Sequence, residues 1–365
     1  MLGDRHDRVT LSLSVVVPFH RDLAQLQRCL EGVNAAGRAL ASSADLREVI
    51  VVADGAVNDP RETTAEAGAR LLAIDGPRGP AVARNRGAET ASGDVIVFID
   101  ADVVTGEQAF ARMATVLVAE PEVSAVFGAY DEEPAHPAFL SQCRNLAHAF
   151  THQRSSRDAA TFWAGLGAVR RNVFRAVGGF DERFERPSVE DIDLGYRILA
   201  AGHRIVLDPT IQGKHLKRWT LRSSVIADVR DRGVPWIQLM YRYGGMRNDL
   251  NVTVAYRTCV VVAYLLVACL VGAWRWPRLL AGVPLALAAL WFLDRPFYQF
   301  FSRKRGFTFA LRWFPFHILH HLTNGVSFVV GTTLWAGKRI GIALPGALPA
   351  NPWDPPRVGV AAPRL

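Results

Sequence analysis

The chain has 365 residues, of which 50% are hydrophobic and 21% charged, which excludes a disordered protein and fits a folded one with membrane segments. Lysine and arginine total 42 against 34 aspartates and glutamates, giving a net charge of +8. No nucleic-acid-binding motif accompanies this charge, so we expect it to face anionic lipid or a phosphorylated substrate. The four cysteines lack the paired spacing of a metal site and are expected to be reduced and structural.

The first 215 residues alternate short apolar runs with segments of helical periodicity. Predicted strands are 13–17, 48–53, 70–74, 95–99, 123–127 and 205–207. Predicted helices are 23–36, 61–69, 81–90, 107–118, 139–152, 169–176 and 190–200. This alternation predicts an α/β fold with a mostly parallel sheet and helices on both faces. Ligands of such sheets bind at the carboxyl ends of the strands, where Pro18, Asp54 and Asp100 lie.

Two carboxylates, Asp100 and Asp102, directly follow the apolar strand 95–99. Side chains two residues apart on an extended chain point the same way. Unpaired carboxylates at the end of an apolar strand are costly, and a divalent ion would neutralise them. Mg²⁺ or Mn²⁺ commonly takes one or two protein carboxylates together with substrate phosphates. We therefore predict a metal site here, with a pair of solvated turn aspartates as the alternative.

Two familiar phosphate-binding motifs are missing from the sequence. The first strand is not followed by Gly-x-Gly-x-x-Gly, and no Walker-type Gly-x-x-x-x-Gly-Lys-Ser/Thr occurs. These absences argue against an ordinary dinucleotide site and against a P-loop. The phosphates of any bound nucleotide would then be held mainly by a metal ion and basic side chains.

Two later segments carry further candidate residues. Trp163 and Gly165 lie in a run of small residues, which suits either a backbone close to a ligand, with the indole as a stacking face, or tight core packing. Glu190, Asp191 and Asp193 open a predicted helix. The helix dipole alone explains acids at this position, and a general base among them is the alternative.

In order and spacing, these motifs resemble family-2 glycosyltransferases, which are inverting enzymes with the nucleotide-sugar-binding fold called GT-A. The resemblance covers about residues 12–220 and departs from the family pattern at Ala53 and His215. Ala53 replaces the first acid of an Asp-Asp-Gly-Ser element, and His215 replaces the glutamine of the Gln-x-x-Arg-Trp element of processive members. The matching segments are Ser14–Pro18, Asp54-Gly55, Ala83-Arg84-Asn85-Arg86-Gly87, Asp100-Ala101-Asp102, Gly178-Gly179-Phe180-Asp181-Glu182, Glu190-Asp191 and His215-Leu216-Lys217-Arg218-Trp219.

The resemblance implies a role for each matching residue. Asp191 would be the catalytic base, and Asp100, Asp102 and His215 would bind Mg²⁺ or Mn²⁺. Contacts to the nucleotide sugar are implied for Pro18, Phe19, Asp54, Arg84 and Asp100. Contacts to the acceptor or the diphosphate are implied for Glu190, Arg218 and Trp219, and they are also expected for Trp163 and Gly165 from their run of small residues.

Long apolar stretches appear only in the last third of the chain. Thr258–Trp274 and Leu279–Leu293 carry no charge and are predicted membrane spans, with a buried core hairpin as the alternative. A third stretch, Phe307–Trp335, contains Arg312 and several histidines, so spanning, re-entrant and interfacial positions all stay open. Basic residues before the first stretch and after the second place both ends on the cytoplasmic side.

The predicted boundaries are 1–12 for an N-terminal extension, 13–230 for a GT-A domain, 231–257 for an interfacial linker, 258–340 for a membrane region of two or three helices, and 341–365 for a disordered tail. The sequence thus predicts a multi-pass, metal-dependent enzyme on the cytoplasmic face of the inner or plasma membrane. It would move sugar from a UDP- or GDP-sugar to a hydroxyl or phosphate of a lipid-linked or glycan acceptor, and would bind no nucleic acid. A sugar-phosphate nucleotidyltransferase and a non-catalytic, membrane-bound nucleotide-sugar-binding protein are the alternatives.

Overall fold

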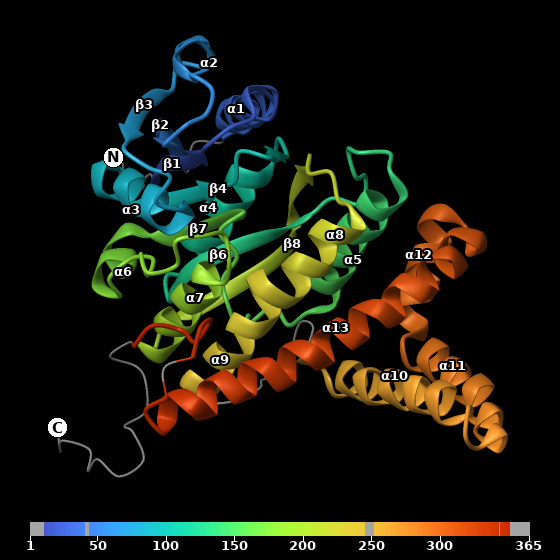
Figure 1. Ribbon diagram of the computed structural model, residues 1–365. Coiled ribbons are helices and arrows are strands. Elements are labelled where there is room, and N and C mark those ends of the chain that lie inside the picture. The colour runs from blue at the N-terminus through green and yellow to red at the C-terminus, as the bar shows by residue number, and fades with distance from the viewer. Residues whose placement is uncertain (1–10, 41–43, 245–251, 343, 351–365) are drawn as a thin grey trace, which may run out of the picture. The chain divides into compact units, whose positions relative to one another are not determined.

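The computed structural model describes residues 11–40, 44–244, 252–342 and 344–350 (Figure 1). The chain divides into two compact units, which we call the N-terminal unit, up to Arg218, and the C-terminal unit, from Trp219 onward. The boundary therefore falls before the predicted position at residue 230.

A single mixed sheet forms the centre of the N-terminal unit. Its eight strands lie in the order β3-β2-β1-β4-β7-β6-β8-β5. Their bounds are β1 Leu11–Phe19, β2 Ala44–Asp54, β3 Arg70–Ile74, β4 Val95–Ile99, β5 Val103–Thr105, β6 Val123–Tyr130, β7 Leu166–Arg170 and β8 Arg204–His215. The pairs β1–β2, β1–β4, β2–β3 and β6–β8 are parallel, whereas β7 and β5 run antiparallel to their neighbours. The predicted α/β class is confirmed, with more antiparallel pairing than expected.

Helices cover both faces of this sheet, as predicted. Because side chains alternate along a strand, Val15 and Val17 of β1 pack into one core and Val16 packs into the other. The first core contains α1 (Leu23–Arg38) and α4 (Ala109–Ala119). The second core contains α3 (Pro80–Thr90), α6 (Arg171–Ala176) and α7 (Glu190–Ala200). Two further helices of this unit are α2 (Arg61–Glu66) and α5 (Phe139–Arg154).

Polar residues gather at one edge of the sheet because of the strand directions. The parallel strands β1, β2 and β4 end there, as do β6 and β8, while β7 begins there with Leu166 paired to Ile99. β5 also begins at this edge, with Val103 paired to His215. Residues far apart in the sequence therefore meet at the ends of adjacent strands.

Two strands were not expected from the sequence, and one is much longer than expected. β7 contains Gly167 and lies between β4 and β6, where a Cβ on Gly167 would come within 2.6 Å of the Phe162 ring. β5 has only three residues. β8 has 12 residues instead of the predicted three, because it continues past Pro209 along β6 to pair with β5.

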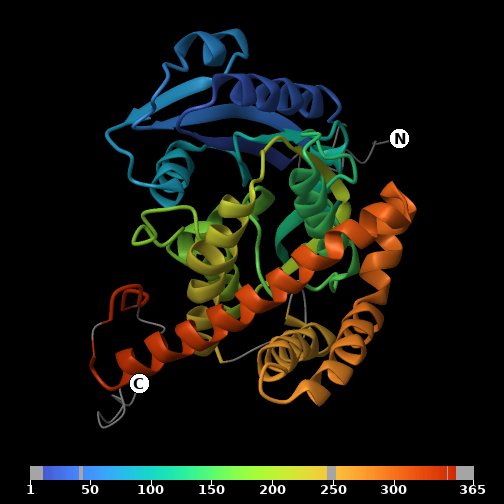
Figure 2. The ribbon, with the colours of Figure 1, turned by 45° about the vertical axis from the view of Figure 1, so that its right-hand side comes forward.

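The C-terminal unit is helical in its described residues. Its elements are α8 Leu221–Ile226, the π-helix η1 Ala227–Gly233, α9 Val234–Arg242, α10 Val254–Gly272, the 3-10 helix η3 Pro277–Ala281, α11 Gly282–Leu293, α12 Arg295–Arg305 and α13 Phe307–Arg339. α13 is one uninterrupted helix of 33 residues, with Pro315 inside it (Figure 2). The third apolar stretch of the sequence is thus a single helix.

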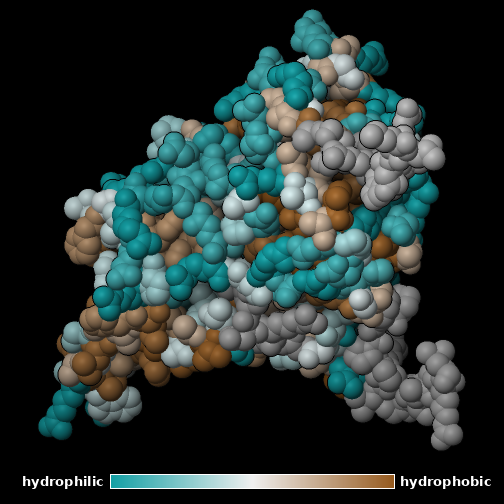
Figure 3. Space-filling model, turned by 180° about the vertical axis from the view of Figure 1, so that it is seen from behind, coloured by the Kyte–Doolittle hydropathy of each residue, from teal (hydrophilic) through white to brown (hydrophobic). Residues whose placement is uncertain are grey.

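One helix of the described chain, α10, is by itself long and apolar enough to cross a membrane, with 19 residues and a mean hydropathy of 2.2. The second predicted span is different: α11 has only 12 residues, and η3–α11 passes the same test only together with α12, at a bend of 71°. The sequence-based expectation of a multi-pass protein is therefore not supported. Apolar side chains of this unit are exposed, among them Trp274 and Leu285, and Figure 3 shows a hydrophobic surface in this region.

Part of the predicted disordered tail makes defined contacts with α9. The backbone N–H of Leu348 donates to Gln238 Oε1 at 2.8 Å, and Gln238 Nε2 donates to the Gly346 carbonyl at 3.1 Å. Arg242 donates to the Pro349 carbonyl at 2.7 Å. Residues 344–350 are thus held against a helix, and the rest of the predicted tail, 351–365, lies outside the described residues.

Candidate active site

The buried guanidinium of Arg84 on α3 joins two acids at the polar edge of the sheet. It donates to Asp100 Oδ1 at 2.7 Å and to Glu190 Oε1 at 2.8 Å, and it lies 5.3 Å from the centre of the Phe180 ring. Burial alone would lower the pKa of Arg84, but the Asp100 and Glu190 carboxylates outweigh it and raise the pKa. Arg84 therefore stays charged and holds the strand end of β4 against the start of α7. A contact from Arg84 to a nucleotide sugar stays a prediction.

Asp102 and His215 face each other where β5 pairs with β8. His215 Nε2 lies 3.3 Å from Asp102 Oδ2, and His215 Nδ1 lies 2.8 Å from Asn145 Oδ1. The Tyr130 ring stacks on the imidazole with 4.3 Å between the ring centres. Burial alone would raise the pKa of Asp102, but the adjacent His215 reverses this and lowers it, so the carboxylate is ionised at neutral pH.

The tautomer of His215 makes this pair suitable for a cation. An amide oxygen can only accept a hydrogen bond, so His215 Nδ1 carries a proton and donates a hydrogen bond to Asn145 Oδ1. In the neutral ring, Nε2 then presents a lone pair to Asp102 Oδ2, and two acceptors at 3.3 Å repel each other unless a cation lies between them. Either a second ring proton or a metal ion meets this requirement.

Asp191 lies in the first turn of α7 and contacts the loop that precedes β7. Its Oδ2 accepts from the Ala164 backbone N–H at 3.2 Å, and its Oδ1 accepts from the Ile192 N–H at 2.8 Å. The next carbonyl along the loop, that of Gly165, accepts from the Asp100 N–H at 3.2 Å. The predicted base and the predicted metal motif are therefore tied to the same short loop.

The two acids at the start of α7 differ in their surroundings. Glu190 is buried, and both of its oxygens are engaged, Oε1 by Arg84 and Oε2 by the Ser188 backbone N–H at 2.8 Å. Asp191 is half-buried, and it accepts hydrogen bonds from two backbone N–H groups. Glu190 therefore has a positioning role within this unit, and the role of Asp191 as the base stays a prediction.

Asp54 anchors a loop of its own unit. Its Oδ1 and Oδ2 accept from the backbone N–H groups of Arg78 at 2.8 Å and Gly79 at 2.7 Å. Gly79 has a φ of +101°, which a residue with a side chain rarely adopts, and it leads directly into α3. Asp54 thereby helps to place the helix that carries Arg84, while its predicted contact with a nucleotide base stays a prediction.

The remaining predicted nucleotide contacts lie at the end of β1. Phe19 is only 2% exposed and belongs to the core on the α1 face. Pro18 is half-buried and pairs with Val52 of β2. Phe19 therefore has a packing role in this structure, and contacts from either residue to a nucleotide stay predictions.

Trp163 packs among aromatic side chains at the same edge. Its ring centre lies 4.8 Å from that of Tyr130 and 5.1 Å from that of His148. A Cβ on Gly165 would lie 2.5 Å from the Trp163 ring, so the glycine is required for the indole to occupy this position. The tight-packing interpretation of this segment therefore holds for Gly165, and the indole is half-buried.

The last two predicted residues lie on either side of the boundary between the units. Arg218 ends the N-terminal unit and is exposed, whereas Trp219 begins the C-terminal unit and is buried. Their predicted contacts with acceptor or diphosphate stay predictions.

Sequence reasoning missed two residues that hold the site together. Asn145 orients His215, and no pattern in the sequence distinguishes it from other polar residues of α5. Asn85 binds both the N–H and the carbonyl of Phe180 and so fixes the Gly-Gly-Phe-Asp-Glu loop. Asn85 lies in the matched Ala-Arg-Asn-x-Gly element, so the motif could have identified it as a candidate site residue.

Two family models match the N-terminal unit. Residues 14–178 match the family described as "Glycosyl transferase family 2", and residues 144–217 match the family described as "N-terminal domain of galactosyltransferase". These two matches together contain every site residue of the N-terminal unit up to His215. The N-terminal unit thus contains a glycosyl transferase family 2 domain, over residues 14–178.

Two curated relatives are named as glycosyltransferases. The "Pre-mycofactocin glycosyltransferase" of Mycobacterium tuberculosis is 29% identical over 257 residues, which cover 67% of this chain and 51% of that protein. The "Validoxylamine A glucosyltransferase" of Streptomyces hygroscopicus is 28% identical over 222 residues, which cover 52% of each chain. The chain thus spans about half the length of these relatives.

Among solved structures, a mannosyltransferase from Pyrobaculum calidifontis, in complex with GDP-Man and Mn²⁺, matches with a TM-score of 0.47 and 16% identity. The match covers 90% of this chain and 88% of that one. A glucosyl-3-phosphoglycerate synthase from Mycobacterium tuberculosis matches with a TM-score of 0.44 and 17% identity, covering 65% of this chain and 80% of the other.

Proposed function

We propose that this protein is a metal-dependent, inverting glycosyltransferase that uses a nucleotide-diphosphate sugar. The observation that carries the proposal is the double contact of Arg84 with Asp100 and Glu190. This contact brings the acid-rich start of α7 next to the acid-rich end of β4. A transferase of this kind needs these two elements together, one to bind the leaving diphosphate and the other to activate the acceptor.

Asp102 and His215 would provide two ligands for a divalent metal ion. Asp100 stays the expected third ligand, although in the described residues its carboxylate oxygens do not lie within 4.8 Å of both other ligand atoms. The pair presents a carboxylate oxygen and an imidazole lone pair at 3.3 Å, and the Asp102 side chain is 27% exposed, so substrate phosphates have access. Mixed oxygen and nitrogen donors suit Mn²⁺ well and Mg²⁺ through the oxygens. The bound ion would supply positive charge to the diphosphate leaving group.

The acceptor side of the reaction falls to Asp191. Its Oδ2 would accept the proton of an acceptor hydroxyl as the hydroxyl oxygen attacks the anomeric carbon from the face opposite the diphosphate. The Ala164 N–H and the Ile192 N–H orient this carboxylate. Arg84 keeps Glu190 in place beside it, and the half-buried Trp163 offers an aromatic surface to a sugar ring.

Two features of the C-terminal unit favour an acceptor that is held at a membrane. α10 has the length and hydropathy of a membrane-crossing helix, and α12 ends in the basic run Arg303-Lys304-Arg305, which suits anionic headgroups. We therefore propose a lipid-linked or membrane-held glycan acceptor, at the cytoplasmic face of the membrane, and a UDP- or GDP-sugar donor.

The test is a screen of the purified chain in detergent against a panel of UDP- and GDP-sugars with Mn²⁺, measuring the release of nucleoside diphosphate with and without a polyprenyl-phosphate acceptor. The proposal expects acceptor-stimulated release with at least one donor and inversion at the anomeric carbon of the product. Release of pyrophosphate from a sugar phosphate and a nucleoside triphosphate would instead identify a nucleotidyltransferase. Nucleotide-sugar binding without turnover of any acceptor would identify a binding protein.

A further inference from the structure

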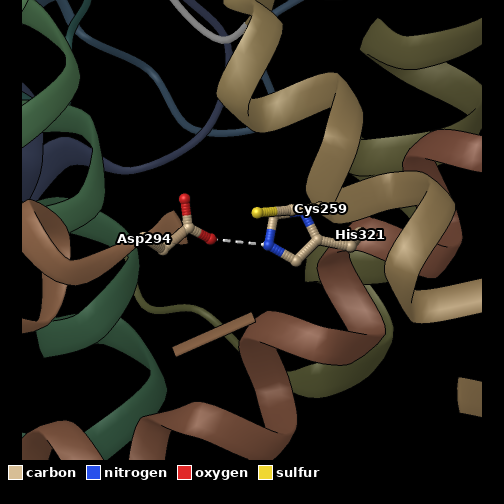
Figure 4. A group of neighbouring side chains, drawn as sticks. All are labelled: Cys259, Asp294 and His321. Atoms are coloured by element: carbon tan, nitrogen blue, oxygen red, sulfur yellow. Dashed lines mark hydrogen bonds and ion pairs between the residues drawn. The ribbon is translucent and has the colours of Figure 1, made fainter. Parts of the chain in front are cut away.

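Three helical segments of the C-terminal unit bring a thiol, a carboxylate and an imidazole to one point (Figure 4). Cys259 comes from α10, Asp294 from the junction between α11 and α12, and His321 from the middle of α13. One potential ligand atom of each residue lies within 4.8 Å of those of the other two. Cys259 and His321 are fully buried, and the Asp294 side chain is only 11% exposed.

The Asp294 carboxylate lacks a permanent positive partner. It accepts from His321 Nε2 at 2.9 Å, and His317 Nδ1 lies 3.7 Å from the same oxygen. No lysine or arginine of the described residues forms an ion pair with it. A nearly buried carboxylate needs a compensating cation, because its desolvation is otherwise costly. Only a doubly protonated imidazole or a bound ion can provide that charge here.

The second nitrogen of His321 is open. Its Nδ1 is buried and has no hydrogen-bond partner among the described residues, although Nε2 is bonded to Asp294. When Nδ1 carries the ring proton, Nε2 presents a lone pair to Asp294 Oδ2 at 2.9 Å, and two acceptors at this distance repel each other. A metal ion bound by both atoms removes this repulsion.

We propose that Cys259, Asp294 and His321 form a zinc site that joins α10, the α11–α12 junction and α13. A thiolate, an imidazole and a carboxylate are the ligands that Zn²⁺ takes in proteins, whereas Mg²⁺ prefers oxygen alone. Three protein ligands leave a fourth position for water. Binding releases the thiol proton of Cys259 to solvent and places a divalent charge beside Asp294. This site is separate from the one at Asp102 and does not depend on the proposed transferase activity.

The first experiment measures metal content. The full chain is purified in detergent, incubated with zinc, dialysed against metal-free buffer and analysed by mass spectrometry for zinc per chain. We expect about one tightly held zinc ion per chain in the wild type and in two controls, Cys269→Ser on the same helix and Asp102→Asn in the other unit. Cys259→Ser and His321→Ala are expected to lose it.

The second experiment uses cobalt, which reports thiolate ligation directly. Titration of the metal-free wild type with Co²⁺ should give a thiolate-to-cobalt charge-transfer absorption that persists in Cys269→Ser and Asp102→Asn and disappears in Cys259→Ser. This wild-type spectrum decides the matter even if the variants fail to fold. A folded wild type that retains no zinc and shows no such absorption would overturn the proposal, as would zinc retained by both Cys259→Ser and His321→Ala.

Discussion

Asp191 accepts a hydrogen bond from the backbone N–H of Ala164, with 3.2 Å between Oδ2 and the nitrogen. The neighbouring Gly165 carbonyl accepts from the N–H of Asp100, which opens the predicted metal motif. Two residues separated by 91 positions in the sequence are therefore linked through two consecutive loop residues. A general base and a metal-binding carboxylate can act on one substrate only if they lie at the same site, as this shared loop requires of Asp191 and Asp100.

The first prediction concerns the base. Asp191→Asn keeps the shape of the side chain but removes its ability to take a proton. We expect sugar transfer to fall by about 10²–10⁴-fold, with binding of the nucleoside diphosphate nearly unchanged. Initial rates and calorimetric titration of the nucleotide separate the two effects. Asp75→Asn, at an exposed position, is the control, and normal turnover in Asp191→Asn would rule out this base.

The second prediction concerns the metal ion. Removal of divalent ions with a chelator should stop transfer, and Mn²⁺ or Mg²⁺ should restore it. Asp102→Asn should raise the Mn²⁺ concentration needed for half-maximal rate, because the ionised carboxylate that faces His215 is lost. A rate that is insensitive to chelation would contradict the proposed site.

The third prediction concerns the buried ion network. Arg84→Met removes the basic partner that Glu190 has among the described residues and leaves a buried carboxylate without compensation. We expect the free energy of unfolding to fall by about 3–5 kcal/mol, since breaking a buried pair from one side has this cost. Urea unfolding of the purified chain, followed by tryptophan fluorescence, measures the change.

Arg86→Met is the matched control for this variant. Arg86 is on the same helix, is half-buried and pairs at 2.7 Å with Glu89, which is exposed. Surface pairs contribute at most about 1 kcal/mol, so the control should unfold close to the wild type. An equal fall in the free energy of unfolding in both variants would show that the buried Arg84 pair stabilises the fold no more than the surface pair does.

The fourth prediction concerns acid stability. Glu48 accepts from the hydroxyls of Ser14 and Ser92 and from the Ser92 backbone N–H, and so it joins β1, β2 and the end of α3. Burial alone would raise the pKa of Glu48, but these hydrogen bonds outweigh it and lower the pKa below the ordinary value of 4.5. A carboxylate with a lowered pKa stabilises the fold at pH values above its unfolded pKa. That contribution to stability is lost as the pH falls through the pKa that Glu48 has in the folded state.

Glu48→Gln should therefore be less stable than the wild type at neutral pH, and the difference should shrink below about pH 4.5. Urea unfolding at a series of pH values measures this, with Glu66→Gln at an exposed position as the control. A difference that is independent of pH would show that the ionised form of Glu48 is not what stabilises the fold.

The sequence predicted the strands whose local pattern reports their burial. The runs at β1, β2 and β4 are continuously apolar because both faces of these strands are covered. β7 was missed because Gly167 interrupts its apolar run, and its place between β4 and β6 exists only in the assembled sheet. β5 was missed because three residues carry no periodicity.

In the C-terminal unit, too, local composition predicted some features, whereas others depend on contacts between distant residues. The apolar stretch at α10 was recognisable by composition, because a helix exposed to hydrocarbon is apolar along its whole length. The second predicted span is not supported as a single helix, because α11 ends at Leu293 and the chain bends there into the basic α12. The cysteines were taken as structural thiols, since the potential ligands around Cys259 lie more than 30 positions away.

By itself, the sequence determined the α/β class, the resemblance to family-2 glycosyltransferases and the candidate acids of the site, because short apolar runs and motifs of a few adjacent residues carry this information. Only the tertiary structure decided their partners: Arg84 with Glu190 at a separation of 106 positions, Asn145 with His215 at 70, and Cys259 with Asp294 and His321. The physical reason is that periodicity reports which side of an element is buried. The contacts of a buried polar group depend instead on which strand ends and helix turns the sheet order and helix packing bring together.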